Sequence, residues 1–553
     1  MSEGKIIING NERVIEGVVK TANTIKTTLG PAGKAVAISN DLGPEVSRDG
    51  ATVAKSVSFK DAGLNLGAQL VKAASSLSES LSGDGTSTTA ILIKEFVEKG
   101  QKAVQTGSNV NELKAGMIKA GKWMTDYIKS KSTAIDGDLE KIRKVATISA
   151  NNDPEIGDLV VKGFEEVGVN GILTAENSSG LETTIKVTTG MKLSRGWASP
   201  NYATQDDGKC VMENPYIIVI GEKLSSVNQM IPILETLSKT GEPFLIICDD
   251  IDESVNTMLV FNVLRGAVRC CVVKGVDYGD NRKNVMADIA IATGAQYYTQ
   301  ENGLSVADQG INHLMNFGRA RKVVISREDT VIYEGQGDSE MIESRIDILK
   351  NRLKDPKLSD YDKSKFESRL ANLAGGIGII SVGGASEVEV NNKKQTVEDA
   401  ILASKSAIAE GCSPGGGYVY LKGALEAEKD SAFWKSLQGD ENEGAKIVFS
   451  GLPVILKTIA ENSGVSGDVV YETVKKSKKE NFGYDAKNKK YVDLPESGIL
   501  DSSKVLRVAL ENAISTASTI LLIDKVILPE PEKSCKCGGE VDDAGPGVGV
   551  PMM

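Results

Sequence analysis

The sequence predicts an α+β multidomain protein in which an α/β unit is inserted between two mostly helical ends. Three observations lead to this prediction. A chain of 553 residues is long enough for three or four domains. Helical periodicity dominates both ends of the chain. Between about residues 150 and 350, apolar β-type runs alternate with helical stretches.

The N-terminal part is expected to be mostly helical. Val14, Val18, Ala22 and Ile25 recur on one helical face, and Gly30-Pro31 ends that helix. Two short extended segments and two longer helices are then expected at 34–39, 45–47, 64–81 and 86–104. About the first 130 residues are therefore predicted to form a helical unit.

The middle of the chain has the pattern of an α/β domain. Short apolar runs are expected to be strands at 216–220, 244–248, 268–273 and 322–325. Helices are expected among them at 226–237, 254–264 and 284–293. This alternation favours a mostly parallel sheet. A charged, mainly helical stretch at 340–373 leaves the domain.

Helical periodicity resumes at 396–410, and the last helix is expected at 503–522. From Pro529 onward, the Gly-, Pro- and Val-rich tail cannot bury a core, so we expect it to be disordered. Helical segments on both sides of an α/β unit indicate that one domain is inserted in another.

Composition excludes several functional classes. The net charge of −11 argues against a main role in nucleic-acid binding, and no apolar run is long enough to cross a bilayer. The N-terminus resembles neither a signal peptide nor an organelle presequence, so we expect a cytoplasmic protein. His313 is the only histidine, which excludes metal sites built on several histidines. In the tail, Cys535 and Cys537 are too few for a structural zinc site.

The most informative stretch is the loop Gly83-Asp84-Gly85-Thr86-Ser87-Thr88-Thr89. Its glycines let the backbone curl, and the helix that follows offers unpaired amides and the positive end of its dipole to a phosphate. The hydroxyls add hydrogen-bond donors, and Asp84 can hold Mg²⁺ beside a phosphate. The alternative is an ordinary Gly-Asp turn with threonine caps. On local grounds both interpretations stay open.

Three further segments have the same character: Thr28-Leu29-Gly30-Pro31, Arg48-Asp49-Gly50 and Gly415-Gly416-Gly417. Each of them, taken alone, is also typical of an ordinary loop. None is a Walker P-loop, because Gly30-Pro31-Ala32-Gly33-Lys34-Ala35 has the wrong spacing and no hydroxyl after its lysine.

The order and spacing of these four segments, together with five others, resemble the GroEL-type group I chaperonins. The resemblance extends from about Asn11 to Leu528. The five other segments are Thr147-Ile148-Ser149-Ala150-Asn151, Arg195-Gly196-Trp197 with Ser199-Pro200, Asp360-Tyr361-Asp362 with Leu373-Ala374-Gly375-Gly376, Glu398-Asp399-Ala400 and Gly498-Ile499-Leu500-Asp501.

The resemblance implies an ATP-driven folding chamber made of stacked seven-membered rings. It divides the chain into an equatorial domain (1–133 and 411–528), an intermediate domain (134–189 and 377–410), an apical domain (190–376) and a flexible tail (529–553). The implied partners are non-native polypeptides, further copies of the chain and a co-chaperonin lid, with neither nucleic acid nor membrane among them. The implied location is the cytosol of a bacterium or of a virus-infected bacterial cell.

The resemblance also implies a site for ATP and Mg²⁺, with K⁺ as an optional further ion. Asp399 would activate the attacking water, Asp49 would assist, and Asp84 would hold Mg²⁺. The implied nucleotide-binding residues are Thr28, Leu29, Gly30, Pro31, Arg48, Asp84, Gly85, Thr86, Ser87, Thr88, Gly415, Gly416, Asp485, Ala486, Ile499 and Asp501. The implied polypeptide-binding groove is lined by Trp197, Tyr202, Ile231, Leu234, Val260 and Phe261.

Four positions depart from the family pattern. Asn201 and Asn256 stand where the groove is usually apolar, Arg48 stands in place of a lysine, and Asp485 stands in place of an asparagine. These departures leave a second interpretation open, in which the protein is a nucleotide-regulated holdase or scaffold ring with impaired turnover. The presence of all three acidic residues of the implied site favours the ATP-driven machine.

Overall fold

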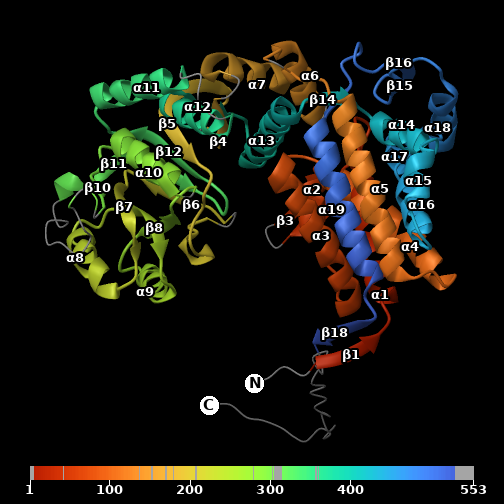
Figure 1. Ribbon diagram of the computed structural model, residues 1–553, viewed down its shortest axis with the longest axis horizontal. Coiled ribbons are helices and arrows are strands. Elements are labelled where there is room, and N and C mark those ends of the chain that lie inside the picture. The colour runs from red at the N-terminus through yellow and green to blue at the C-terminus, as the bar shows by residue number, and fades with distance from the viewer. Residues whose placement is uncertain are drawn as a thin grey trace, which may run out of the picture.

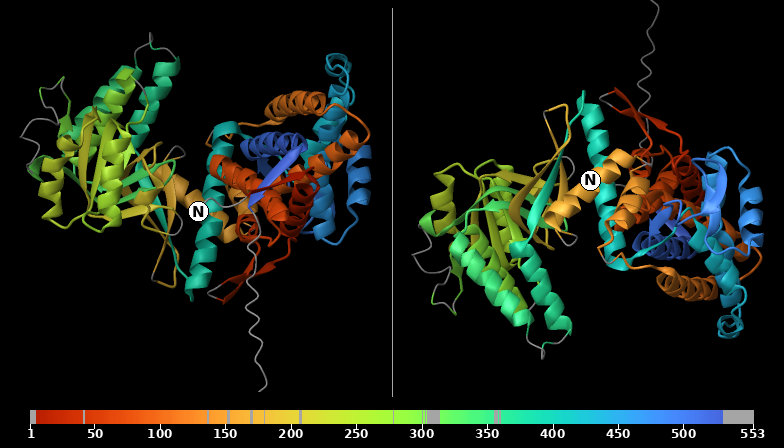
Figure 2. Two further views of the ribbon diagram at one scale, coloured as in Figure 1. Left: turned by 90° about the horizontal axis from the view of Figure 1, so that it is seen from below. Right: turned by 90° about the horizontal axis from the view of Figure 1, so that it is seen from above.

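The computed structural model (Figure 1) describes residues 5–40, 43–135, 137–150, 153–168, 171–178, 180–205, 208–277, 279–299, 301, 303, 314–354, 358 and 360–529. His313, Cys535, Cys537 and the predicted tail beyond residue 529 lie outside the described residues. A helical lobe and a sheet lobe are joined by a smaller middle part, which Figure 2 shows from below and from above.

The helical lobe is built from both ends of the chain (Figure 1). Its N-terminal helices are α1 (Glu12–Lys26), α2 (Gly50–Ser56), α3 (Ala62–Ser82), α4 (Thr86–Gln105) and α5 (Val110–Lys131). Its C-terminal helices are α14 (Tyr418–Ala427), α15 (Ser431–Lys435), α16 (Glu441–Gly451), α17 (Val454–Asn462), α18 (Gly467–Lys476) and α19 (Ser503–Leu521). Apolar side chains from both sets share one core, in which Phe96, Met117 and Ile520 are buried.

Four pairs of short antiparallel strands complete the helical lobe and its border. They are β1 (Lys5–Asn9) with β18 (Lys525–Pro529), β2 (Val36–Asn40) with β3 (Gly43–Ser47), β14 (Cys412–Pro414) with β17 (Leu500–Ser502), and β15 (Phe482–Asp485) with β16 (Lys490–Asp493). The first pair brings the two ends of the described chain together.

The sheet lobe contains most of a ten-stranded mixed sheet. Its strands are β5 (Thr184–Leu193), β6 (Cys210–Glu213), β7 (Tyr216–Leu224), β8 (Phe244–Ile251), β9 (Cys270–Lys274), β10 (Tyr297–Tyr298), β11 (Gly318–Ile325) and β12 (Thr330–Gly335). Its helices are α8 (Val227–Ser238), α9 (Glu253–Leu264), α10 (Gly279–Thr293), α11 (Ser339–Leu353) and α12 (Asp360–Ala374), with 3₁₀ turns at Pro200–Tyr202 and Leu314–Asn316. The apolar strands β7, β8 and β9 lie in the centre of its core.

The middle part consists of α6 (Leu139–Ser149), α7 (Pro154–Val167), β4 (Ile172–Asn177), β13 (Gly376–Val382) and α13 (Glu387–Glu410). It has a core of its own, which includes Ile142, Phe164 and Val397. The sheet continues through it in the order β4-β13-β5-β12-β11-β7-β8-β9, so the middle part and the sheet lobe share hydrogen-bonded strands. At its end α13 reaches the helical lobe, where Arg507 Nε lies 2.9 Å from a Glu410 carboxylate oxygen.

The structure confirms the elements expected from periodicity, with ends shifted by a few residues in most of them. Two expectations are corrected. The sheet is mixed and not mostly parallel: β7 to β10 pair in parallel, as do β4 and β13, whereas β5, β6, β11 and β12 pair antiparallel, because apolar alternation does not fix strand direction. The second correction is the start of α13, which lies nine residues before the predicted residue 396. The mainly helical stretch expected at 340–373 is confirmed as α11 and α12.

Candidate functional site

A cavity of about 770 Å³ lies where the middle part meets the helical lobe, and it gathers segments that are far apart in the sequence. It contains most of the nucleotide-binding residues expected from the sequence: Thr28, Leu29, Gly30, Pro31, Arg48, Asp84, Gly85, Ser87, Thr88, Gly416, Asp485, Ala486, Ile499 and Asp501. Both expected catalytic residues, Asp49 and Asp399, also line it. Thr86 and Gly415 do not line it, and their surroundings are described below.

The N-terminus of α4 is open toward this cavity. Gly85, at the N-cap, has φ +97°, a left-handed conformation that glycine adopts at little cost. In the described residues, aspartate or asparagine side chains cap α2, α3, α5, α6 and α7, whereas no side chain caps α4. The first-turn amides of a 20-residue helix thus keep their hydrogen-bonding capacity for a ligand.

Thr86 is buried at this terminus, and its carbonyl accepts a hydrogen bond from Ser75 at 3.2 Å. It therefore belongs to the contact between α3 and α4, and Ser87 and Thr88 face the cavity instead. The hydroxyls of Ser87 and Thr28 lie 3.3 Å apart, which joins the two hydroxyl-bearing segments that the sequence singled out.

Asp84 lies beside the α4 N-terminus and lines the cavity, where its side chain remains accessible to solvent. Its carboxylate accepts hydrogen bonds from the Gly85 amide and, at 3.3 Å, from the Ser149 hydroxyl. Partial desolvation by the cavity wall raises the pKa of Asp84 above its usual value, and the negative charge of Asp49 adds to this effect. Among the described residues Asp84 has no ion pair with a cationic side chain. A bound divalent cation would stabilise its charged form, because Mg²⁺ prefers carboxylate and phosphate oxygens.

Asp399 enters the cavity from α13. Burial raises its pKa well above the usual value, and the like charges of Asp49 and Asp84 raise it further. Such a carboxylate holds a proton more strongly than an ordinary aspartate, which is the property that a general base near neutral pH requires. A single helix of the middle part thus supplies an acidic group to a cavity whose other acidic groups belong to the helical lobe.

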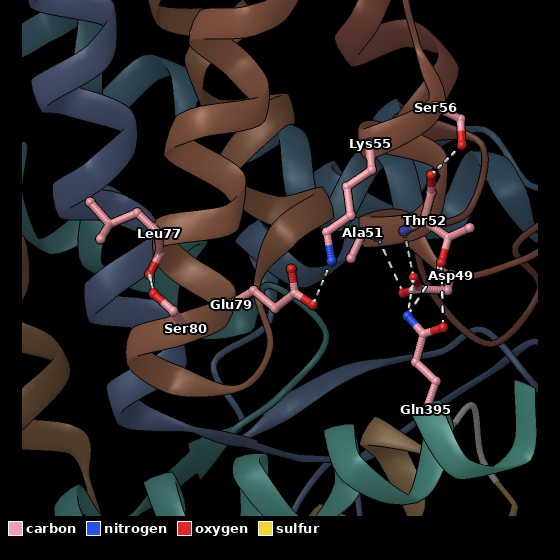
Figure 3. A network of polar contacts seen from close by, with 9 residues as sticks. All are labelled: Asp49, Ala51, Thr52, Lys55, Ser56, Leu77, Glu79, Ser80 and Gln395. Carbon is pink, nitrogen blue, oxygen red and sulfur yellow. Dashed lines mark hydrogen bonds and ion pairs between the residues drawn. The ribbon is translucent and has the colours of Figure 1, made fainter. Parts of the chain in front are cut away.

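Asp49 is held rigidly at the start of α2. Its carboxylate accepts from the backbone amides of Ala51 at 3.2 Å and Thr52 at 2.6 Å, as an N-cap does. Figure 3 shows that Gln395 of α13 approaches the same carboxylate, with its amide nitrogen 2.7 Å from Asp49 Oδ2. Arg48 precedes Asp49 and is exposed at the edge of the cavity.

The opposite end of the cavity is formed by the β15–β16 hairpin and β17. Asp485 lines it, but both of its carboxylate oxygens accept hydrogen bonds within the turn, from Lys487 N and from the amide groups of Asn488. The side chain of Asp485 is therefore committed to the hairpin. Ala486 and Ile499 present apolar surface at this end, which suits the face of a nucleobase.

Asp501 explains why Gly415 is a glycine. A Cβ atom at Gly415 would lie 2.7 Å from Asp501 Oδ1, so any larger residue would displace the carboxylate. Gly415 thus makes room for Asp501 and does not itself line the cavity. Burial raises the pKa of Asp501 to about 7, and the charge of Asp84 contributes to the increase.

This raised pKa predicts a pH-dependent stability of the nucleotide-free protein. The folded state binds the Asp501 proton more tightly than the unfolded state does, so stability falls as the pH rises from about 4 to about 7. We expect Asp501→Asn to stabilise the protein by about 2 kcal/mol at pH 8 and to have little effect at pH 4.5. Thermal unfolding at the two pH values measures this difference. Asp126→Asn, on an exposed carboxylate of α5, is the control, and an equal effect of Asp501→Asn at both pH values would contradict the prediction.

The expected polypeptide-binding residues lie in the sheet lobe, around α8 and α9. Ile231 of α8 and Phe261 of α9 are 42% and 50% exposed. Leu234 and Trp197 are half-buried, and the Trp197 indole nitrogen donates to the carbonyl of Gly208 at 3.1 Å. Four of the six expected residues therefore reach the surface.

Tyr202 and Val260 do not form an exposed groove in this structure. Tyr202 is fully buried, and its hydroxyl donates to Asn256 Oδ1 at 2.8 Å, which ties the 3₁₀ turn to α9. Val260 is on the inner face of α9 and is also buried. Leu264, one turn after Phe261 on the same helical face, is 68% exposed and was not among the expected residues.

A model of the TCP-1/cpn60 chaperonin family matches residues 21–531 of the chain. The chain belongs to this family. "Chaperonin GroEL" of Methanospirillum hungatei JF-1 is 38% identical to this chaperonin over 546 residues, which are 98% of this chain and 100% of that relative. Sequence similarity at this level and coverage confirms the resemblance to the GroEL-type proteins.

Solved structures support the same fold for this chaperonin. A crystal structure of the chaperonin gp146 from the bacteriophage EL 2 (Pseudomonas aeruginosa), determined in the presence of ATP-BeFx, matches with a TM-score of 0.72 and 19% identity over 96% of this chain and 100% of that one. A second crystal form of gp146 matches with a TM-score of 0.64 over 95% of this chain and 99% of that one. At this identity the comparison shows a common fold.

The cavity between the middle part and the helical lobe also contains residues for which the sequence analysis predicted no role. Thr147 and Ser149 of α6 line it, and Ser149 bonds Asp84 directly. Both belong to the segment 147–151 that carries the family resemblance, which was the available signal. Gln395 had no such signal, because its partner Asp49 is 346 residues away in the chain.

Among the residues that the structure describes, no three His, Cys, Asp or Glu side chains are grouped so that they could hold a metal ion by themselves. Asp84 with substrate phosphates is a donor set that fits Mg²⁺, since this ion usually keeps water and takes one or two carboxylates. In the same described residues, no helix combines the length and apolarity needed to span a membrane.

Proposed function

We propose that this chaperonin hydrolyses ATP and uses the associated movement of its domains to bind and fold non-native polypeptides inside a ring of identical subunits. The observation that carries the proposal is the cavity itself. It combines an uncapped α4 N-terminus, a carboxylate at Asp84 whose pKa is raised, and Asp399 on a helix of a different part of the molecule. We further propose the domain boundaries given above, with equatorial, intermediate and apical domains corresponding to the helical lobe, the middle part and the sheet lobe.

Different residues of the cavity bind the different parts of ATP and the attacking water. The amides that begin α4, with Thr28, Gly30, Ser87 and Thr88, bind the phosphates. Asp501 and Gly416 bind the ribose, and Ile499 and Ala486 contact the base. Asp84 holds Mg²⁺, which when bound neutralises phosphate charge. Asp399 orients the attacking water and accepts its proton at a carboxylate oxygen, and Asp49 assists in placing that water.

The proposed binding of polypeptides by the apical domain rests on exposed apolar side chains. Ile231, Phe261 and Leu264 lie on α8 and α9, which contact each other and form a small apolar surface. Unfolded polypeptides expose apolar side chains, so a surface of this kind recognises them by that common property. Arg265 lies over the ring of Phe261 at 3.9 Å and gives the surface a polar edge.

Refolding of a chemically denatured, aggregation-prone enzyme tests the proposed function. We expect recovery with ATP and none with a non-hydrolysable analogue, in assays with and without a co-chaperonin. Phe261→Ser is expected to lower client capture several-fold, because it removes half-exposed aromatic surface without opening a buried core. Leu181→Ser, at a 76% exposed residue outside α8 and α9, is the matched control.

Two results would count against the proposal. Recovery at the same yield without ATP would contradict the ATP-driven cycle. Capture of the client without recovery under any condition would favour the alternative of a nucleotide-regulated holdase or scaffold ring. If Phe261→Ser captures the client as well as the parent does, the apolar surface on α8 and α9 is not the client-binding site. This result would not affect the ATPase proposal.

A further inference from the structure

Gln395 makes a contact between domains that no part of the proposed function requires. It lies on α13 one helical turn before Asp399, so the two side chains emerge on the same side of the helix. Its amide nitrogen donates to Asp49 Oδ2 at 2.7 Å and lies 3.3 Å from the Thr52 hydroxyl. In Figure 3 the Gln395 side chain extends from α13 directly to the start of α2.

The partner of this contact is a fixed point. Asp49 is already held by two backbone amides of its own helix, so its carboxylate has little freedom to follow a moving side chain. The Thr52 hydroxyl lies 3.4 Å from the Gln395 carbonyl oxygen, within reach as a donor. The primary amide of glutamine, with a donor and an acceptor, matches a carboxylate beside a hydroxyl.

A second contact fixes α13 on the other side of Asp399. Ser406 donates to the carbonyl of Ser82 at 2.8 Å, and Leu402 packs directly on Gly83. Asp399 thus lies between two attachment points of α13, one at α2 and one at the end of α3. Removing the first leaves the catalytic carboxylate attached from one side only.

Docking of α13 has an electrostatic cost. It brings Asp399 close to Asp49, Asp84 and Glu79, and all of these carry the same sign of charge when ionised. A neutral amide that donates to Asp49 is attractive at the place where repulsion would otherwise separate the two helices. The ion pair between Lys55 and Glu79, 3.4 Å apart, reduces the negative charge beside it (Figure 3).

We propose that Gln395 is a positioning residue for ATP hydrolysis, which docks α13 on Asp49 and thereby places the Asp399 carboxylate in the cavity. This inference rests on the proposed ATPase function. Gln395 acts through Asp49 and Asp399 and does not itself line the cavity. It therefore affects the rate of the chemical step and leaves nucleotide binding in place.

Steady-state ATP hydrolysis by the full-length protein tests this role. We expect Gln395→Ala to lower kcat about tenfold, as loss of a hydrogen bond to a charged group does, with the KM for ATP changed by less than about twofold. Asn392→Ala is the matched control, because it removes an exposed amide from the same helix, one turn earlier. Thermal unfolding of both variants shows whether each is folded.

Gln395→Glu separates positioning from a merely structural effect. Protonated glutamic acid keeps a donor at this position, whereas the carboxylate repels Asp49. The charged groups on the packed elements are Arg48, Asp49, Lys55, Glu79, Asp84, Lys394, Glu398 and Asp399. Because most of them are acidic, they favour the protonated form of the introduced glutamic acid side chain. We expect the kcat of Gln395→Glu to be within about threefold of the parent kcat at pH 5.5 and about tenfold below it at pH 8, with the two proteins compared at equal pH.

Each outcome decides the matter. A parent without ATPase activity would overturn the proposed function before Gln395 is considered. With an active parent, a normal kcat in Gln395→Ala would overturn the positioning role, as would an increase in KM at constant kcat or an equal loss in Asn392→Ala. If the ratio of the kcat of Gln395→Glu to that of the parent does not change with pH, the hydrogen bond to Asp49 is not the cause of the effect.

Discussion

We expect Asp399→Ala to lower the rate of ATP hydrolysis by a factor of about 10² to 10⁴, the range typical of a lost general base. Binding of ATP should stay equal or become tighter, since the change removes a carboxylate that is close to Asp49 and Asp84 and repels phosphate. Hydrolysis under saturating ATP and nucleotide binding by equilibrium titration are the two measurements.

Glu398→Ala is the control for this prediction. Glu398 is the neighbouring acidic residue on α13 and does not line the cavity. Its carboxylate lies 3.7 Å from Lys394 Nζ in a half-buried pair. We expect it to keep most of the activity. Asp399→Ala with more than a tenth of the parent rate would show that another group activates the water.

Gly83→Ala is expected to have the second largest effect. Gly83 ends α3 with φ +75°, and an added Cβ would overlap the Cβ of Leu402 and lie 2.9 Å from its Cα. Because this neighbour belongs to α13, the helix must move away from the cavity, and Asp399 moves with it. We expect kcat to fall at least about tenfold, since small misplacements of catalytic groups are costly.

Gly107→Ala provides a matched control. Gly107 also has a left-handed conformation, with φ +99°, but an added Cβ meets nothing within 4 Å. Both substitutions carry the backbone cost of about 1 kcal/mol, and only Gly83→Ala adds the overlap with α13. Thermal unfolding and ATP hydrolysis of the two variants measure the two effects. Equal losses of activity would contradict a specific role of the contact between Gly83 and Leu402.

Local sequence patterns predicted much of the fold, because they depend on interactions within a few residues. The helices α3, α4 and α19 were predicted with ends within about two residues of the observed ones, since apolar spacing and glycine breakers determine them. The helix α1 ends at Lys26, four residues before the breaker expected to end it. Strand direction in the sheet was not predictable in this way. The beginning of α13 was missed as well, because residues 387–395 are mainly polar.

The candidate site was also predictable only where it depends on local sequence. The loop 83–89 and the segment 28–31 were singled out from their own residues, and the structure places both in one cavity. The burial of Tyr202 depends on a hydrogen bond to Asn256, 54 residues later, and no local pattern reports such a contact. Asp485 was expected to face a ligand, but its carboxylate is used by the neighbouring turn.

The construction of the helical lobe from both chain ends has a consequence for synthesis on the ribosome. About 290 residues separate the end of α5 from the start of α14, and the N-terminal helices share a core with α14, α16 and α19. At about 5–20 residues per second, α1 to α5 emerge roughly 15–60 s before the first of those partners. During that interval their apolar faces are uncovered while the sheet lobe completes its own core. The newly made subunit is therefore itself an aggregation-prone polypeptide until its last helix has been synthesised.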